Sequence, residues 1–133
     1  MYAPTVRGAA VYQQTQVQCG TPLELVVKLY DSAIANMVKA REGLTRGDLR
    51  AKRDAVSQTL AILSELQSCL DMKTGGEIAA SLDALYSYIS GCVLDFNAKR
   101  NLSSLDEAQR LMATLREAWQ QIASVNPGPQ STP

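Results

Sequence analysis

Few side chains in this chain could do catalytic or metal chemistry. The 133 residues include no histidine, and this removes the commonest general base, metal ligand and pH switch. The carboxylates of Asp106 and Glu107 are adjacent on a predicted helix, where neighbouring side chains do not face each other. Gly75 and Gly76 at a predicted helix start could cradle an anion, but Glu77 in the same turn would repel a phosphate. We therefore interpret the two glycines as a turn.

The three cysteines, Cys19, Cys69 and Cys92, are odd in number and far apart in the sequence. They form no Cys-x-x-Cys pair, so the pattern favours reduced, mostly buried thiols over a disulfide framework or a zinc site. Together with the missing histidine, this predicts a protein that is not an enzyme. It also predicts that the protein needs no metal and no cofactor.

The charges balance, with 13 Lys and Arg against 13 Asp and Glu. Zero net charge argues against a nucleic-acid partner. The one basic concentration is Arg46, Arg50, Lys52 and Arg53, which we interpret as a solvated helix start rather than a phosphate site. Residues 1–20 lack an apolar stretch of signal-peptide length, and no apolar run reaches the roughly 18 residues that span a bilayer. We expect a cytoplasmic protein without membrane insertion.

Helix-start signals recur along the chain. Ser or Thr is followed three residues later by Glu at Thr21, Thr74 and Ser104, and Asp48 is a fourth possible cap. These signals, with apolar residues at helical spacing, predict four helices near 22–44, 48–71, 75–98 and 104–124.

Short linkers between long helices make neighbours antiparallel, so we expect an all-α protein with an up-down four-helix bundle over residues 21–125. Residues 1–20 are predicted to form a mobile N-terminal arm. Residues 126–133, which contain three prolines, are predicted to form a disordered tail.

The apolar residues cover more of three helices than a bundle core requires. The last helix has a single stripe that includes Leu111, Leu115 and Trp119, and Trp119 is expected to anchor the core rather than to form a ligand platform. The other three helices carry extra rows beside their core stripes. These rows contain Leu25, Leu29 and Ala33 on the first helix, Ile62, Leu66 and Cys69 on the second, and the small residues Ala80, Ala84 and Gly91 on the third. Such rows are typical of interaction surfaces. An irregular bundle with wider helix contacts would also explain them.

Several segments resemble the FliS-type flagellar export chaperones. The run from Pro22 to Ile34, Pro-Leu-Glu-Leu-Val-Val-Lys-Leu-Tyr-Asp-Ser-Ala-Ile, resembles the family's first-helix signature. The most specific match is Leu70-Asp71, then Gly75-Gly76-Glu77-Ile78-Ala79, Leu82, Leu85-Tyr86 and Tyr88. Leu115-Arg116-Glu117-Ala118-Trp119, the opening Met1-Tyr2 and the stretch Ala9 to Tyr12 also match. Ser32 and Ser81 stand where the family usually has Gly and Asn.

The resemblance implies an antiparallel helical bundle in the bacterial cytosol. Such a protein would bind the C-terminal segment of newly made flagellin, prevent its early polymerisation and deliver it to the flagellar type III export gate. The extra apolar rows would then be the flagellin-binding surface. The resemblance also assigns Tyr2, Ala9 and Tyr12 of the arm to docking at the export gate or to covering the groove. The alternative is a structural helical module that self-associates, as a homodimer for example, through the same rows.

Overall fold

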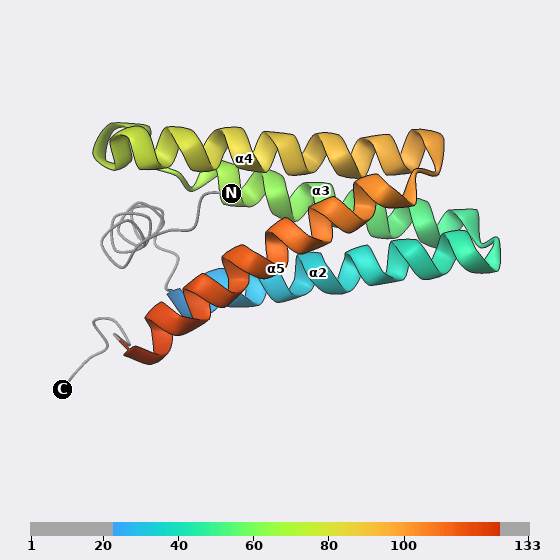
Figure 1. Ribbon diagram of the computed structural model, residues 1–133, viewed down its shortest axis with the longest axis horizontal. Coiled ribbons are helices and arrows are strands. Elements are labelled where there is room, and N and C mark those ends of the chain that lie inside the picture. The colour runs from blue at the N-terminus through green and yellow to red at the C-terminus, as the bar shows by residue number, and fades with distance from the viewer. Residues whose placement is uncertain (1–22, 126–133) are drawn as a thin grey trace.

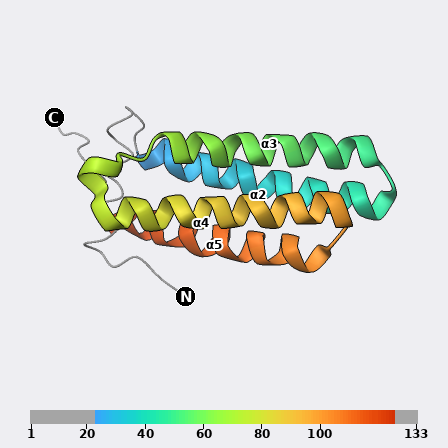
Figure 2. The ribbon, with the colours of Figure 1, turned by 90° about the horizontal axis from the view of Figure 1, so that it is seen from above.

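The computed structural model describes residues 23–125, and the side chains of residues 24–121. The described chain is four helices: α2 (Leu23–Arg46), α3 (Leu49–Ser68), α4 (Met72–Lys99) and α5 (Leu102–Val125). Consecutive helices run antiparallel, and α2 packs against α3 and α5 while α4 packs against the same two (Figures 1 and 2). The prediction of an all-α up-down four-helix bundle is confirmed. The predicted arm, the predicted tail and the cap at Thr21 lie outside the described residues.

The helix ends follow local capping, though not always at the predicted residue. Asp48 caps α3 as expected, because its side chain accepts a hydrogen bond from the Ala51 amide at 3.1 Å. The expected cap at Thr74 is wrong. Asp71 caps α4 instead and accepts from the Lys73 and Thr74 amides, both at 3.1 Å. These bonds hold the pKa of the Asp71 carboxyl below its usual value, with the Thr74 contribution the largest.

The start of α5 differs in the same way. The Asn101 side chain, rather than Ser104, accepts from the first-turn amide of Ser103 at 3.1 Å. In both helices a short Asx side chain three residues upstream of the predicted cap starts the helix earlier. Of the predicted glycine turn, Gly76 does break the backbone, but inside α4: it has φ +53° and ψ −130°, so α4 bends after its first turn.

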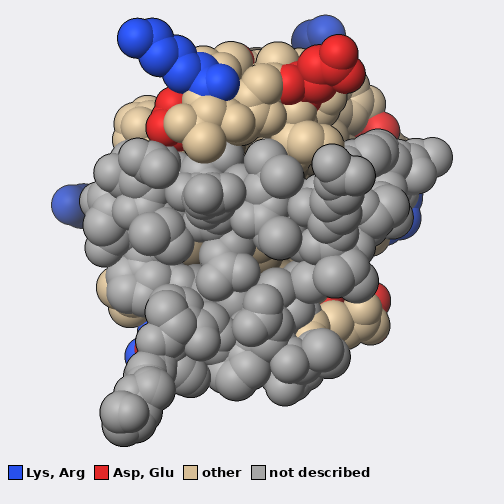
Figure 3. All heavy atoms as spheres, turned by 90° about the vertical axis from the view of Figure 1, so that its left-hand side faces the viewer, with Lys and Arg blue, Asp and Glu red and all other residues tan. Residues whose placement is uncertain are grey.

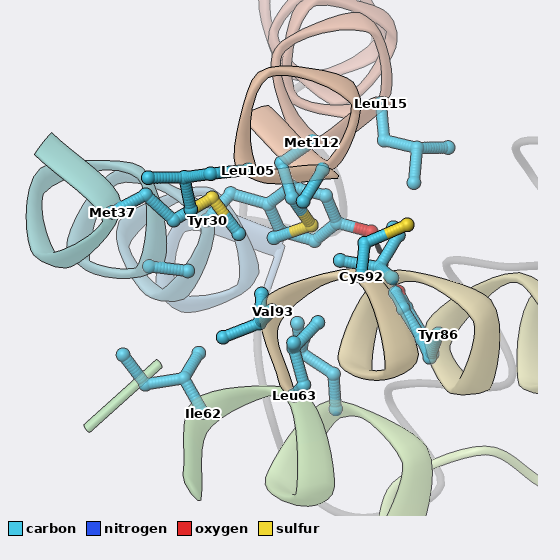
Figure 4. Close-up of a cluster of buried hydrophobic side chains, with 14 of the residues drawn as sticks. Tyr30, Met37, Ile62, Leu63, Tyr86, Cys92, Val93, Leu105, Met112 and Leu115 are labelled. Atoms are coloured by element: carbon cyan, nitrogen blue, oxygen red, sulfur yellow. Dashed lines mark hydrogen bonds between the residues drawn. The ribbon is translucent and has the colours of Figure 1, made fainter. Parts of the chain in front are cut away.

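The core is largely apolar, and its buried polar groups include a pair of tyrosine hydroxyls. Tyr30 of α2 and Tyr86 of α4 are fully buried and joined by a 2.6 Å hydrogen bond, with their rings edge to face at 6.5 Å (Figure 4). Trp119 is 1% exposed, which confirms its role as a core anchor. The other large buried side chains are Met37, Leu63, Leu66, Ile89, Phe96, Leu105 and Met112.

Three residues of the predicted extra rows belong to the core. Ile62 and Leu66 are 9% and 1% exposed, and Ala33 is fully buried. Figure 4 shows Ile62 and Leu63 both extending from α3 into the interior. The prediction that Ile62, Leu66 and Ala33 form exposed surface is therefore wrong. Each helix sits at a corner of the bundle and packs against two neighbours, so its buried arc is wider than one stripe.

The close packing of α2 on α3 depends on Gly43. A Cβ built on Gly43 would lie 2.7 Å from the Lys52 amide nitrogen and 3.0 Å from the Asp48 carbonyl oxygen. Both neighbours are backbone atoms, so they cannot move aside as a side chain can. The glycine therefore sets how near the first turn of α3 comes to α2.

Candidate functional site: the hollow between α4 and α5

The path of α5 shapes the surface of the bundle. Near its start, α5 lies against α4, where Ser104 donates to Asp95 at 2.6 Å and Tyr88 donates to Glu107 at 2.6 Å. The bond to the Glu107 carboxylate raises the pKa of Tyr88 to about 12. Further along, α5 crosses obliquely away from α4 and toward α2 (Figure 1).

Polar contacts hold α5 to α2 along this crossing. Arg41 of α2 pairs with Asp106 and donates to Gln109 at 2.6 Å. Arg116 donates from Nε to Asp31 of α2 at 2.6 Å. Because α5 diverges from α4 while it stays attached to α2, a gap opens between the later part of α5 and the earlier part of α4.

This gap forms an apolar hollow with a volume of about 410 Å³. Leucines make up most of its wall, and the residues at its edges are small. Its lining residues are Ser81, Leu82, Ala84 and Leu85 of α4 with Leu111, Thr114 and Leu115 of α5. Leu82 and Leu115 are buried, while Ser81 and Ala84 are exposed. A depression of this size with leucine walls can hold apolar side chains of a partner.

The small-residue row of α4 lies on the surface as predicted. Ala80, Ala84 and Gly91 are all exposed, and Ala84 also lines the hollow. Nothing lies within 4 Å of a Cβ built on Gly91. The hollow and this row therefore form one continuous, uncharged surface at Ala84.

The remaining predicted binding residues are spread over the molecule. Leu25 is 47% exposed, and Leu29 of α2 and Cys69 after α3 are half-buried. None of them lines the hollow. The structure thus brings together only Ala80, Ala84 and Gly91 from the predicted flagellin-binding set. Tyr2, Ala9 and Tyr12 lie outside the described residues.

Six of the seven lining residues were not predicted as binding residues, for two different reasons. The four leucines carry the apolar pattern of a core stripe; Leu82 and Leu115 are buried, and Leu85 and Leu111 are half-buried. Ser81 and Thr114 carry no apolar signal at all. Their position at the hollow depends on the angle at which α5 crosses α4, which no local pattern of residues encodes.

The basic concentration at the start of α3 is only partly a solvated face. Arg46, Arg50 and Arg53 are exposed as expected, but Lys52 is buried, which corrects that part of the prediction. The Lys52 ammonium donates to the Asn97 carbonyl oxygen at 3.1 Å and lies 5.8 Å from the centre of the Phe96 ring.

We also searched the described residues for metal-ligand clusters, membrane-spanning helices and a surface of one charge sign. Within residues 23–125, no three His, Cys, Asp or Glu side chains gather as metal ligands would, and no helix is long and apolar enough to cross a bilayer. At the end of the bundle where α4 begins, the described charges at the top of Figure 3 are of both signs. The hollow offers apolar contact, which suits binding rather than catalysis.

Comparison with known proteins supports this conclusion. A family model described as "Flagellar protein FliS" matches residues 6–126. The flagellar secretion chaperone FliS of Salmonella typhimurium is 34% identical over 124 residues, 90% of this chain and 92% of the relative. The flagellar secretion chaperone FliS of Vibrio cholerae is 29% identical over 108 residues, 81% of this chain and 79% of the relative. The flagellar secretion chaperone FliSB of Pseudomonas aeruginosa is 28% identical over 127 residues, 92% and 99% of the two chains.

These relatives are named as chaperones and not as enzymes, in agreement with the prediction of a non-enzymatic protein. The family model covers all of the described bundle, including both helices that line the hollow. The chain belongs to the FliS family of flagellar proteins.

Proposed function

We propose that this chain is a cytoplasmic flagellar secretion chaperone that binds the C-terminal segment of unpolymerised flagellin. By covering that segment it prevents premature polymerisation, and it then delivers flagellin to the flagellar export gate. The observation that carries the proposal is the hollow between α4 and α5, which continues into the uncharged outer row of α4. Family membership supplies the flagellar context.

The physical basis is the exchange of apolar surface between chaperone and client. A disordered segment cannot bury its own apolar face until a partner provides a matching one. Each large apolar side chain that enters the hollow contributes about 1.5–3 kcal/mol. Ordering the segment opposes most of that gain, so the net affinity stays moderate and the client can be released.

Docking at the export gate rests on the resemblance alone. Tyr2, Ala9 and Tyr12 match the family's docking and covering arm, and we keep this assignment as a prediction. Pull-down of the isolated export-gate component with full-length protein and with Tyr12→Ala checks it. Undiminished binding by the variant would remove Tyr12 from this role.

The client site is tested by isothermal titration with a peptide of the flagellin C-terminal segment. Ala84→Glu places a charge at the edge of the hollow without touching the core, so peptide affinity should fall at least about tenfold. Ala61→Glu is the matched control, because Ala61 is also exposed but lies on α3 and does not line the hollow. Unchanged affinity of Ala84→Glu, with helix content intact, would refute the hollow as the client site.

The self-associating alternative uses the same exposed row of α4. Sedimentation of the protein with and without the flagellin peptide separates the two functions. A chaperone forms a complex with one peptide, whereas a structural module forms oligomers of itself that the peptide does not dissolve.

A further inference from the structure

A second surface of α4 lies on the edge opposite the hollow, along the seam with α3. Gln67 of α3 donates to the Asp83 carbonyl oxygen at 3.1 Å and to the Ser87 hydroxyl at 2.9 Å. Residues seven apart share a face of a helix, and antiparallel helices advance in opposite directions. One step of seven from the Gln67–Ser87 contact therefore brings Leu60 opposite Leu94.

The next step of seven leads from Leu60 to Arg53 and from Leu94 to Asn101, the residue after Arg100, which caps α4. Arg53 and Arg100 therefore both belong to this end of the seam. We call Leu60, Leu94, Arg53 and Arg100 the basic seam. In it, Leu94 is 51% exposed, Leu60 is half-buried, and both arginines are exposed.

Neither arginine of the basic seam forms an ion pair with a described carboxylate. The ion pairs of residues 23–125 are Arg41–Asp106, Lys99–Asp95 and Arg116–Asp31, and none includes Arg53 or Arg100. Beneath them lies the buried Lys52 ammonium. Its pKa is lowered first by burial and then by the charges of Arg100 and Arg53, so each of the two arginines lies close enough to repel the Lys52 ammonium.

The end of α4 accounts for only part of this arrangement. The carbonyls at a helix C-terminus attract cations, which explains Lys52, because its ammonium binds the Asn97 carbonyl. It does not explain an exposed leucine beside the arginines. Arg100 also has φ +56°, a backbone conformation in which glycine or asparagine is free of strain. This chain places an arginine there instead.

We propose that the basic seam docks an acidic amphipathic helix of a second protein partner, at the opposite edge of α4 from the client hollow. An apolar side chain of the partner would contact Leu60 and Leu94, and its carboxylates would pair with Arg53 and Arg100. The two contacts lie about seven residues apart, or about 10.5 Å along a helix. Arginine suits this role because its guanidinium binds carboxylates through two parallel hydrogen bonds.

The leucines favour a protein helix over nucleic acid or an anionic membrane. A phosphate backbone is bound by a wide stripe of cations, whereas the basic seam has two exposed cations next to an apolar contact. The core of a protein–protein interface is apolar, and arginine is enriched at interfaces relative to the rest of the surface. The proposal goes beyond the proposed function, because it requires neither flagellin nor the hollow.

The test is a nuclear magnetic resonance titration of the isotope-labelled full chain with a designed probe peptide. The probe is a helix with two leucines one turn apart and three glutamates two turns further along. A second peptide carries lysine in place of each glutamate. We expect saturable shifts of the Leu94 and Arg53 amides with the acidic probe, and at least about tenfold weaker binding of the lysine peptide.

Variants locate the contact. Arg53→Gln combined with Arg100→Gln should weaken the acidic probe about tenfold or more, and Leu94→Ser about threefold or more. Arg110→Gln, which removes an exposed arginine of α5, is the matched control and should change nothing. Ala84→Glu in the hollow should also leave probe binding unchanged. Circular dichroism shows that each variant keeps its helix content.

Two results would overturn the proposal. One is equal binding of the acidic probe to the wild type and to the doubly substituted Arg53 and Arg100 variant. The other is that the protein binds phosphatidylglycerol vesicles or a duplex oligonucleotide through the basic seam, and binds them more tightly than the acidic probe. Either outcome would assign the basic seam to another class of partner.

Discussion

Replacing Leu66 by alanine decides whether the second apolar row of α3 is core or client surface. Leu66 is 1% exposed and belongs to the central apolar cluster. Truncating a leucine in such a site removes about 2–5 kcal/mol from the free energy of unfolding, through lost burial and the cavity left behind. A domain of this size has about 5–15 kcal/mol in all. At about 4–8 °C per kcal/mol, a loss of 3 kcal/mol lowers the melting temperature by roughly 12–24 °C.

Urea and thermal unfolding followed by circular dichroism measure this change. Leu25→Ala is the matched control, since Leu25 is 47% exposed and its truncation should change stability by no more than about 0.5 kcal/mol. For the same reason, Ile62→Glu combined with Leu66→Glu should prevent folding, because two unpaired charges would enter the core. A Leu66→Ala protein that melts like the wild type but no longer binds the flagellin peptide would refute the core assignment.

Three further outcomes follow from the packing. Gly43→Ala should destabilise the fold by about 1–3 kcal/mol because its Cβ meets the backbone of α3, whereas Gly91→Ala should stabilise α4 by about 0.5–1 kcal/mol. Thermal melting compares the two variants, and an equal change in melting temperature would contradict the close approach of α2 and α3 at Gly43. Tyr30→Phe and Tyr86→Phe each remove the buried 2.6 Å hydrogen bond between the two hydroxyls and should lower the free energy of unfolding by about 1 kcal/mol. In a double-mutant cycle, the double variant should lose less than the sum of the two single losses. Additive losses would mean that the two hydroxyls do not interact. Burial raises the pKa of both tyrosines, so their contribution to stability is complete below the unfolded-state pKa of about 10 and is lost as the pH rises above that value. Urea unfolding at alkaline pH should show this decline. A free energy of unfolding that stays level from about pH 9 to pH 11 would contradict it.

The sequence is sufficient to predict the bundle, because the relevant signals are local. Asp48 caps α3 where predicted, and the short turns after α2, α3 and α4 leave consecutive helices no alternative to antiparallel packing. The position of Trp119 in the core also follows from helical spacing. The caps at Thr74 and Ser104 are misplaced because Asp71 and Asn101 compete for the same amides from nearer positions.

The site is harder to predict because it depends on how helices meet. Ile62 and Leu66 lie about 100° from the stripe through Leu60 and Leu63 on an isolated helix, and only the bundle shows that a second neighbour covers them. Ser81 and Thr114 line the hollow because α5 leaves α4 and stays paired with Asp31 of α2 through Arg116. A one-dimensional pattern contains neither the crossing angle nor the second neighbour.

The charge distribution along α4 explains why the two proposed surfaces share this helix. Between Glu77 and Asp95 the one charged residue is Asp83, and its carboxylate accepts a 3.0 Å bond from Gln67 of α3. A surface helix normally carries charges on its solvent side, and stripping water from them opposes binding. The outer side of α4 has little charge to desolvate, so a partner can approach from either edge. Binding at the hollow then draws on apolar contact alone, while binding at the basic seam adds the charges of Arg53 and Arg100, and only the latter should weaken as salt concentration rises.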